Sequence, residues 1–117
     1  MQKNGYRDLI VWQKSVALVV AIYELVALFP REEVYGLTSQ MKRASVSVPS
    51  NIAEGSRRRG AKDTLHFLNM AYGSASELET QIEIAKQLKL AVKDKFNKVD
   101  VLIEEVLKML NKMTQPK

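Results

Sequence analysis

The sequence predicts an all-α fold: one antiparallel, up-down-up-down bundle of four helices that spans residues 1–117 as a single domain. Three observations support this prediction. Apolar residues recur at intervals of three and four along four segments, which is the period of one helix face. Only five glycines and three prolines occur, too few for a turn-rich β protein of this length. A hydrophobic content of 46% and a charged content of 26% are typical of a globular domain.

The first helix is expected over residues 8–29. Pro30 ends it, because the residue before a proline avoids the α region. The residues expected to face the core share one stripe at helical spacing: Leu9, Trp12, Val16, Val19, Tyr23 and Val26. For Trp12 and Tyr23 the sequence leaves open whether they face the core or a neighbouring chain.

The second helix is expected over residues 36–55. Pro49 lies inside it and is expected to kink it or to cost about 3 kcal/mol in a lost hydrogen bond. The helix is expected to end at Gly55 or within the next turn, because glycine is the usual left-handed residue past a C-terminus. The core stripe is expected to consist of Leu37, Met41, Ala44, Val48 and Ile52.

The third and fourth helices are expected over residues 62–89 and 94–113. Alanines in the third stripe, with Gly73–Ser76 beside them, predict that a neighbouring helix approaches closely. The core residues of the third helix are expected to be Leu68, Ala71, Ala75, Leu78, Ile82 and Ala85. Those of the fourth are expected to be Phe96, Val99, Ile103, Val106, Leu110 and Met113.

The first helix carries a second apolar stripe beside its expected core face. A helix that is apolar nearly all round is expected to be buried on both sides, whereas a four-helix monomer buries only one. A second copy of the chain is therefore expected to cover the other side; a wide core-facing sector is the alternative. The interface residues are expected to be Ala17, Val20, Ala21, Leu25 and Leu28.

The sequence offers little for catalysis, and no catalytic residue, metal ligand or cofactor is assigned. It has no cysteine and one histidine, His66, so thiolate chemistry and a multi-histidine metal centre are excluded. Neither a Glu-x-x-His pair nor a phosphate-binding glycine loop occurs. The N-terminus does not resemble a signal peptide, and the apolar run Val16–Phe29 is shorter than the roughly 18 residues of a membrane span. A non-enzymatic, cytoplasmic protein that does not span a membrane is expected.

Several polar residues lie on otherwise apolar helical segments. They either point inward as hydrogen-bonded pairs, for example Arg43 with a glutamate, or face solvent, and spacing alone leaves both possibilities open. The candidates for structural polar residues are Gln40, Asn51, Glu54, Glu77 and Glu79.

A basic segment joins the second and third helices. Arg57, Arg58, Arg59 and Lys62 occur there without an acidic residue and account for most of the net charge of +5. Guanidinium groups donate forked hydrogen bonds to phosphate oxygens, so the segment is a candidate nucleic-acid contact. A solvated loop whose arginines pair with acids of a neighbouring subunit is the alternative. No aromatic residue interrupts the segment, so sequence-specific base recognition is not expected.

A set of motifs resembles the bacterial four helix bundle protein family, named for members encoded in intervening sequences of 23S rRNA genes. The matching segments are Asp8–Lys14, Phe29–Pro30, Tyr35–Leu37, Gln40–Ala44, Asn51–Gly55, Phe67–Leu68, Ala71–Ser74 and Glu77–Gln81. Lys42 departs from the pattern, because a second arginine is expected there. The resemblance implies a ring of four-helix bundles, typically a homopentamer, and suggests association with RNA. It implies no enzymatic activity. A similar pentamer, more distant in sequence, is the accessory protein of diversity-generating retroelements and binds nucleic acid and a reverse transcriptase.

Two functional hypotheses follow. In the first, a ring-forming bundle binds RNA or single-stranded DNA electrostatically through Arg57, Arg58, Arg59 and Lys62, with Lys42 and Arg43 as secondary contacts. In the second, the ring is a scaffold for a protein partner such as a reverse transcriptase, and the arginines make subunit contacts.

Overall fold

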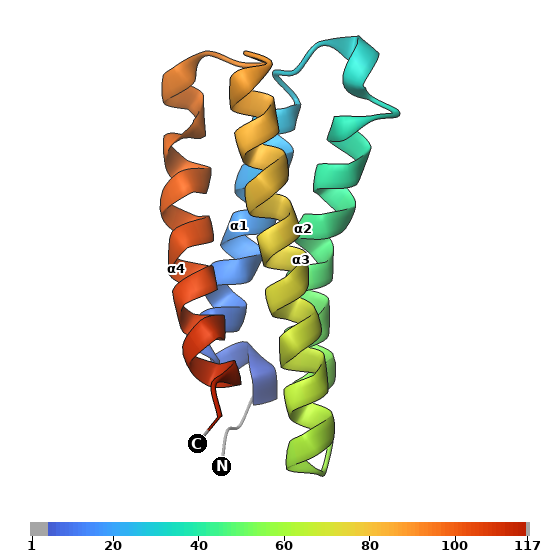
Figure 1. Cartoon of the computed structure of the whole chain (residues 1–117), viewed down its shortest axis with the longest axis vertical. Coiled ribbons are helices and arrows are strands. Elements are labelled where there is room, and N and C mark those ends of the chain that lie inside the picture. Colours follow the sequence, from blue (N-terminus) through green and yellow to red (C-terminus); the bar gives the residue numbers. More distant parts are fainter. Residues whose placement is uncertain (1–4, 117) are drawn as a thin grey trace.

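The structure, a computed structural model, describes residues 5–116, which form four α helices and no strand (Figure 1). The helices are α1 (Ile10–Val26), α2 (Leu37–Ser56), α3 (Ala61–Gln87) and α4 (Asn97–Thr114). Short 3-10 helices precede α1, α2 and α4: η1 (Gly5–Asp8), η2 (Arg31–Glu33) and η3 (Lys93–Phe96). Sequential helices are antiparallel and pack side by side, and α4 returns to α1, which closes the bundle. The predicted all-α class and the four helices are confirmed.

The α2–α3 pair is the most closely packed part of the bundle. The predicted α3 stripe is confirmed, and its alanines, Ala71, Ala75 and Ala85, have no exposed surface. Small side chains let the two helices approach, and Ser47 and Ser74 hydrogen-bond across the contact at 2.8 Å. The predicted α2 core is buried as well, except that Leu37 is only partly covered.

Helix α4 follows its predicted core stripe, with one expected residue exposed and one unexpected residue buried. Met113 remains 40% exposed near the C-terminus, whereas Leu102, which was not among the expected core residues, is buried. Phe96 is almost fully buried just before α4, and its ring centroid lies 6.4 Å from that of Phe29. This aromatic pair joins the end of α1 to the start of α4.

The orientation predicted for α1 is wrong. The buried residues are Val11, Ser15, Leu18, Ala21, Ile22, Leu25 and Val26, so of the expected core stripe only Val26 is fully buried. Ala21 and Leu25, expected at an interface between copies, are each 3% exposed and lie in the chain's own core. Since nearly every α1 residue is apolar, more than one stripe fits the helical period, and packing against α2 and α4 selects the face.

Helix α2 ends within the turn after Gly55, as expected, but the left-handed conformation predicted for Gly55 is wrong. Gly55 has no positive φ and lies inside α2, which continues to Ser56. A Cβ at position 55 would lie 3.0 Å from Phe67 Cβ and 3.2 Å from the Thr64 carbonyl oxygen. Glycine is therefore required here by the close approach of α3. Pro49 is buried in the same helix, which remains helical for seven residues past it.

Candidate nucleic-acid interface

The predicted basic segment forms the turn between α2 and α3 at one end of the bundle. In Figure 1 this turn lies beyond the ends of α1 and α4, so it projects from the molecule. Arg57 caps α2 in αR geometry, and its backbone N–H donates to the Glu54 carbonyl at 3.2 Å. Thr64 Oγ1 donates to the Gly55 carbonyl at 3.0 Å and thereby fastens the first turn of α3 to the last turn of α2. The side chains of Arg57, Arg58, Arg59 and Lys62 are displayed on this fixed backbone.

The fold brings an aromatic pair and a fifth basic residue to this turn. Tyr6 lies in η1, where its ring centroid is 4.9 Å from Arg7 Cζ and 5.4 Å from Arg57 Cζ. The ring of Trp12 packs edge-on against Tyr6, with the centroids 5.1 Å apart. Guanidinium groups are attracted to the faces of aromatic rings, so Tyr6 holds Arg7 and Arg57 close together despite their like charge.

A second aromatic residue orients Arg58. Its guanidinium carbon lies 4.7 Å from the centroid of the Phe67 ring on α3, and its Nη2 donates to the Glu54 carboxylate one turn earlier in α2. The charge of Arg58 is thus partly neutralised within the chain. The candidate structural role of Glu54 is this exposed ion pair, which fixes the direction of one arginine.

The remaining basic side chains are not neutralised. Within residues 5–116, Arg7, Arg57, Arg59 and Lys62 are exposed and form no ion pair with a carboxylate. Four positive side chains without such a pair therefore gather at one end of the bundle. No aromatic residue interrupts the segment in sequence, but the fold brings Tyr6 and Phe67 beside it, from 51 residues before Arg57 and 9 residues after Arg58. Arg7, Tyr6 and Phe67 were missed because only the tertiary fold places them beside the turn.

The two secondary candidates do not join this cluster. Lys42 and Arg43 lie some 14 residues before Arg57 on one helix, which is about 20 Å along the axis at 1.5 Å per residue. Lys42 faces α1, where its Nζ lies 4.9 Å from the centroid of Tyr23. Arg43 instead lines a shallow hollow between α2 and α3 with Gln40, Ser47 and Glu77. They are not part of the same contact surface.

The candidate structural polar residues differ in burial. Asn51 is half-buried and donates to the backbone carbonyl and the hydroxyl of Ser47 at 2.9 and 3.0 Å. Gln40, Glu77 and Glu79 are exposed, and the Arg43–glutamate pair suggested by the sequence is not formed among the described residues. Gln81 was missed: its side chain is buried, its Nε2 lies 3.4 Å from Glu77 Oε2, and its Oε1 has no hydrogen-bond partner.

An apolar surface remains open on α1. Ala17, Val20 and Leu28 of the expected interface are exposed, the last two by 52% and 54%. A shallow groove between α1 and α2 is lined by Val19, Val20, Tyr23, Glu24 and Val46. Part of the expected interface stripe is therefore accessible to another molecule.

The described residues contain no cluster of three or more histidine, cysteine, aspartate or glutamate side chains that could hold a metal ion. His66 is exposed on α3 and packs edge-on against Phe67, with the ring centroids 5.2 Å apart. No helix in the described part of the chain combines the length and apolar character needed to cross a membrane.

Fold and site together define a small all-α bundle with a projecting basic end. Residues 7–112 match the family model described as 23S rRNA-intervening sequence protein, and the chain belongs to this family. A similar solved structure is a protein of unknown function from the S23 ribosomal protein family of Bacteroides thetaiotaomicron, with a TM-score of 0.83 and 22% identity over 92% of this chain and all of that one. No curated protein sequence matches. The matched family and the solved structure carry no description of an enzymatic activity.

Proposed function

We propose that the protein is a non-enzymatic, ring-forming bundle, typically a pentamer, that binds RNA through the α2–α3 turn. The observation that carries this proposal is the gathering of Arg7, Arg57, Arg59 and Lys62 at one projecting end, none of them in an ion pair with a carboxylate of residues 5–116. The naming of the family for 23S rRNA intervening sequences supports RNA as the nucleic acid.

The arrangement suits a flexible single strand. Positive side chains neutralise phosphates and release counterions, which supplies affinity independent of sequence. The Tyr6 and Phe67 rings and the guanidinium planes that lie against them offer surfaces on which unpaired bases stack. Double-stranded RNA offers no such stacking surface, so single-stranded segments are the preferred target.

The first test is fluorescence anisotropy with a labelled 30-nucleotide RNA at two salt concentrations. Wild-type protein cleared of nucleic acid is compared with the triple variant Arg57→Gln, Arg58→Gln, Arg59→Gln. Because each phosphate contact on a single strand contributes about 0.7 to the log–log salt slope, the triple variant is expected to lower the slope by about 2 and the affinity at least tenfold.

A matched control removes three charges from the opposite end of the bundle: Lys89→Gln, Lys93→Gln, Lys95→Gln. It lowers the net charge equally, so it is expected to change RNA affinity by less than about threefold. Equal losses in both triple variants would show a diffuse charge effect rather than a site at the turn. Absence of binding by the wild-type protein at low salt would overturn the proposal.

The proposal that the chain forms a ring is based on the open apolar surface of α1. Val20 stands in this surface, whereas Val101 of α4 is equally exposed among charged neighbours. Val20→Asp is therefore expected to dissociate the oligomer in native mass spectrometry, and Val101→Asp is expected to leave it intact. A wild-type mass equal to that of one 13.3 kDa chain would exclude a ring.

A protein partner is the second candidate, and the apolar groove formed by α1 and α2 favours it. In this case a partner such as a reverse transcriptase docks on the ring and the arginines serve subunit contacts. The triple arginine variant separates the two functions: it leaves the oligomer intact if the arginines bind RNA, and weakens the oligomer or partner binding if they do not.

A further inference from the structure

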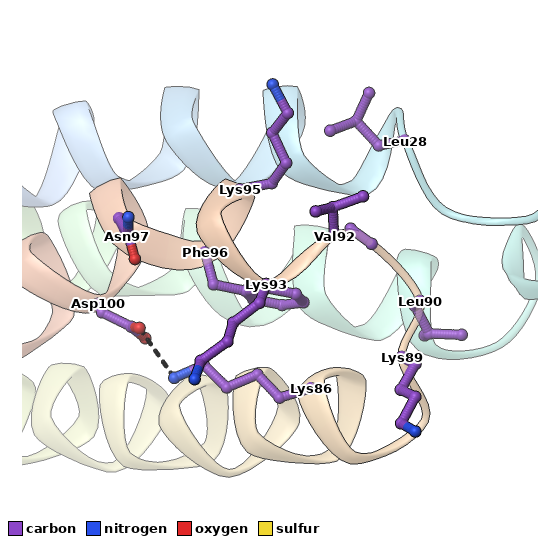
Figure 2. Close-up of a pocket in the computed structure, with 11 residues that line it drawn as sticks. Leu28, Lys86, Lys89, Leu90, Val92, Lys93, Lys95, Phe96, Asn97 and Asp100 are labelled. Atoms are coloured by element: carbon purple, nitrogen blue, oxygen red, sulfur yellow. Dashed lines mark hydrogen bonds and ion pairs between the residues drawn. The ribbon is translucent and has the colours of Figure 1, made fainter.

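A second basic region surrounds a cavity at the end of the bundle opposite the α2–α3 turn. The cavity has a volume of about 870 Å³ and lies between the α3–α4 connection and the end of α1 (Figure 2). Its lining combines four lysines, one aspartate and several apolar residues: Leu28, Lys86, Lys89, Leu90, Ala91, Val92, Lys93, Lys95, Phe96, Asn97 and Asp100.

The lining carries an excess of three positive charges, because Asp100 is its one carboxylate. Lys86 Nζ donates to Asp100 at 2.8 Å, and an ammonium group has two further protons to donate. Figure 2 shows Lys86 and Lys93 extending toward Asp100, whereas Lys89 and Lys95 extend away from it. The amines of Lys86 and Lys93 therefore converge on one side of the cavity, where Asp100 offsets one of their two charges.

The rest of the lining is aliphatic and partly open to solvent. Leu28 and Val92 are 54% and 70% exposed, and Leu90 lies between them and α3. The buried ring of Phe96 closes the cavity toward the core. Exposed apolar side chains next to ammonium groups form a surface that is complementary to an anion with an aliphatic chain.

One of these lysines has a strained backbone conformation in the α3–α4 connection. Lys89 has φ of 56°, in the left-handed region where glycine is usual. It stands in a helix-ending motif in which its N–H donates to Lys86 O at 3.0 Å and Leu90 N–H donates to Ala85 O at 3.1 Å. Lys89 therefore adopts a conformation that is sterically costly for a residue with a Cβ.

We propose that this cavity binds a small amphipathic anion, namely a carboxylate with an aliphatic chain. The carboxylate lies at Lys86 and Lys93, and the chain lies along Leu28, Leu90 and Val92. The concave shape favours a small molecule over a nucleic acid. The proposal is independent of RNA binding at the other end.

The test is titration of the ¹⁵N-labelled full chain with decanoate below its micelle concentration, followed by amide chemical shifts. Saturable shifts are expected for residues 86–100 and Leu28, with a Kd of about 1 mM or lower. Acetate, which lacks the chain, and decyltrimethylammonium, which has the opposite charge, are expected to bind at least tenfold more weakly. Equal shifts with the cationic probe, or shifts confined to α1 and α2, would overturn the proposal.

The double variant Lys86→Gln, Lys93→Gln is expected to weaken decanoate binding about fivefold. Its matched control is the double variant Lys98→Gln, Lys108→Gln, because these two lysines of α4 do not line the cavity. Equal weakening in the control would contradict a defined site. If the double variant does not fold, the comparison of the three probes on wild-type protein decides the question. Displacement of decanoate by the 30-nucleotide RNA would assign the cavity to nucleic acid instead.

Discussion

The two turns that flank α3 are both basic, yet they are built from different chemistry. The α2–α3 turn projects and carries arginines against the rings of Tyr6 and Phe67. The α3–α4 connection surrounds a cavity and carries lysines beside aliphatic side chains. Arginine has a flat, delocalised cation that stacks, whereas lysine has a compact charge on a flexible chain. Net charge alone would describe the two ends as equivalent, and residue type separates them.

The backbones of the two turns also differ, because each turn is subject to a different constraint. Glycine at position 55 serves the close approach of α3, so the first turn is tightly packed and without left-handed residues among its described positions. The second turn needs a left-handed residue and has Lys89 there. One turn is limited by space and the other by backbone conformation.

Gly55→Ala disrupts the close contact between α2 and α3 beside the first turn, and it has the largest expected effect on stability. The added methyl meets Phe67 and the Thr64 backbone, and overpacking outweighs the gain in helix propensity, so the free energy of unfolding is expected to fall by about 1–2 kcal/mol. Urea denaturation measures it. Gly73→Ala is the control: a Cβ there meets nothing within 4 Å, and a gain of about 0.5–1 kcal/mol is expected. A gain in both variants would show that α3 is not tightly packed at Gly55.

Tyr6→Leu sharpens the contrast between stacking and aliphatic surfaces. Loss of the ring releases Arg7 and Arg57 and removes a stacking surface, so RNA affinity is expected to fall about fivefold, which is about 1 kcal/mol. Decanoate binding at the other end is expected to stay unchanged. Tyr35→Leu serves as the comparison, since Tyr35 is 98% exposed and precedes α2 at the opposite end. Similar RNA losses in both variants would remove Tyr6 from the site.

Lys89→Gly isolates the strain in the second turn. Glycine adopts the left-handed conformation without steric cost, so stability is expected to rise by about 0.5–1 kcal/mol, measured by thermal and urea unfolding. Lys89→Ala keeps the Cβ and is expected to give no such gain. If alanine stabilises as much as glycine, charge repulsion among the lysines, and not backbone conformation, is the destabilising factor.

Asp100→Asn has the smallest expected effect. It frees Lys86 from its carboxylate partner, so decanoate affinity is expected to rise about twofold, while the free energy of unfolding changes by less than about 1 kcal/mol. Glu104→Gln breaks the exposed Lys108–Glu104 pair outside the cavity and is expected to leave decanoate affinity unchanged. Calorimetric titration of the two variants distinguishes release of Lys86 from a general gain in positive charge.

Most of the fold could be predicted where apolar and polar residues alternate clearly. The stripes of α2 and α3 and most of that of α4 are confirmed, because charged residues on the opposite face leave one orientation. Helix α1 lacks this contrast: Val19 was expected in the core and is only partly buried, whereas Leu18 was not expected and is fully buried. Gly55 was predicted to be a left-handed residue at the end of its helix, because spacing along one helix does not reveal the distance to its neighbour.

The candidate site could be predicted only where its residues are adjacent in sequence. Arg57, Arg58, Arg59 and Lys62 are displayed together, as expected, because one short turn carries them. Tyr6 and Phe67 join them only through helix packing. The lysines of the cavity were overlooked because the charges of residues 61–117 nearly cancel in sequence, whereas the fold turns Lys86, Lys93 and Lys95 toward one end.

The short connections of the bundle also set the order in which its contacts can form. The α2–α3 hairpin closes a turn of four residues, Arg57–Gly60, whereas α1 meets α4 only after the rest of the chain is in place. Local contacts lose little chain entropy on closure and form first. The hairpin is thus the expected folding nucleus, and its amide protons, around Val48 and Ala75, should exchange with solvent last. The projecting arginine end then belongs to the part of the molecule that assembles earliest and opens least often.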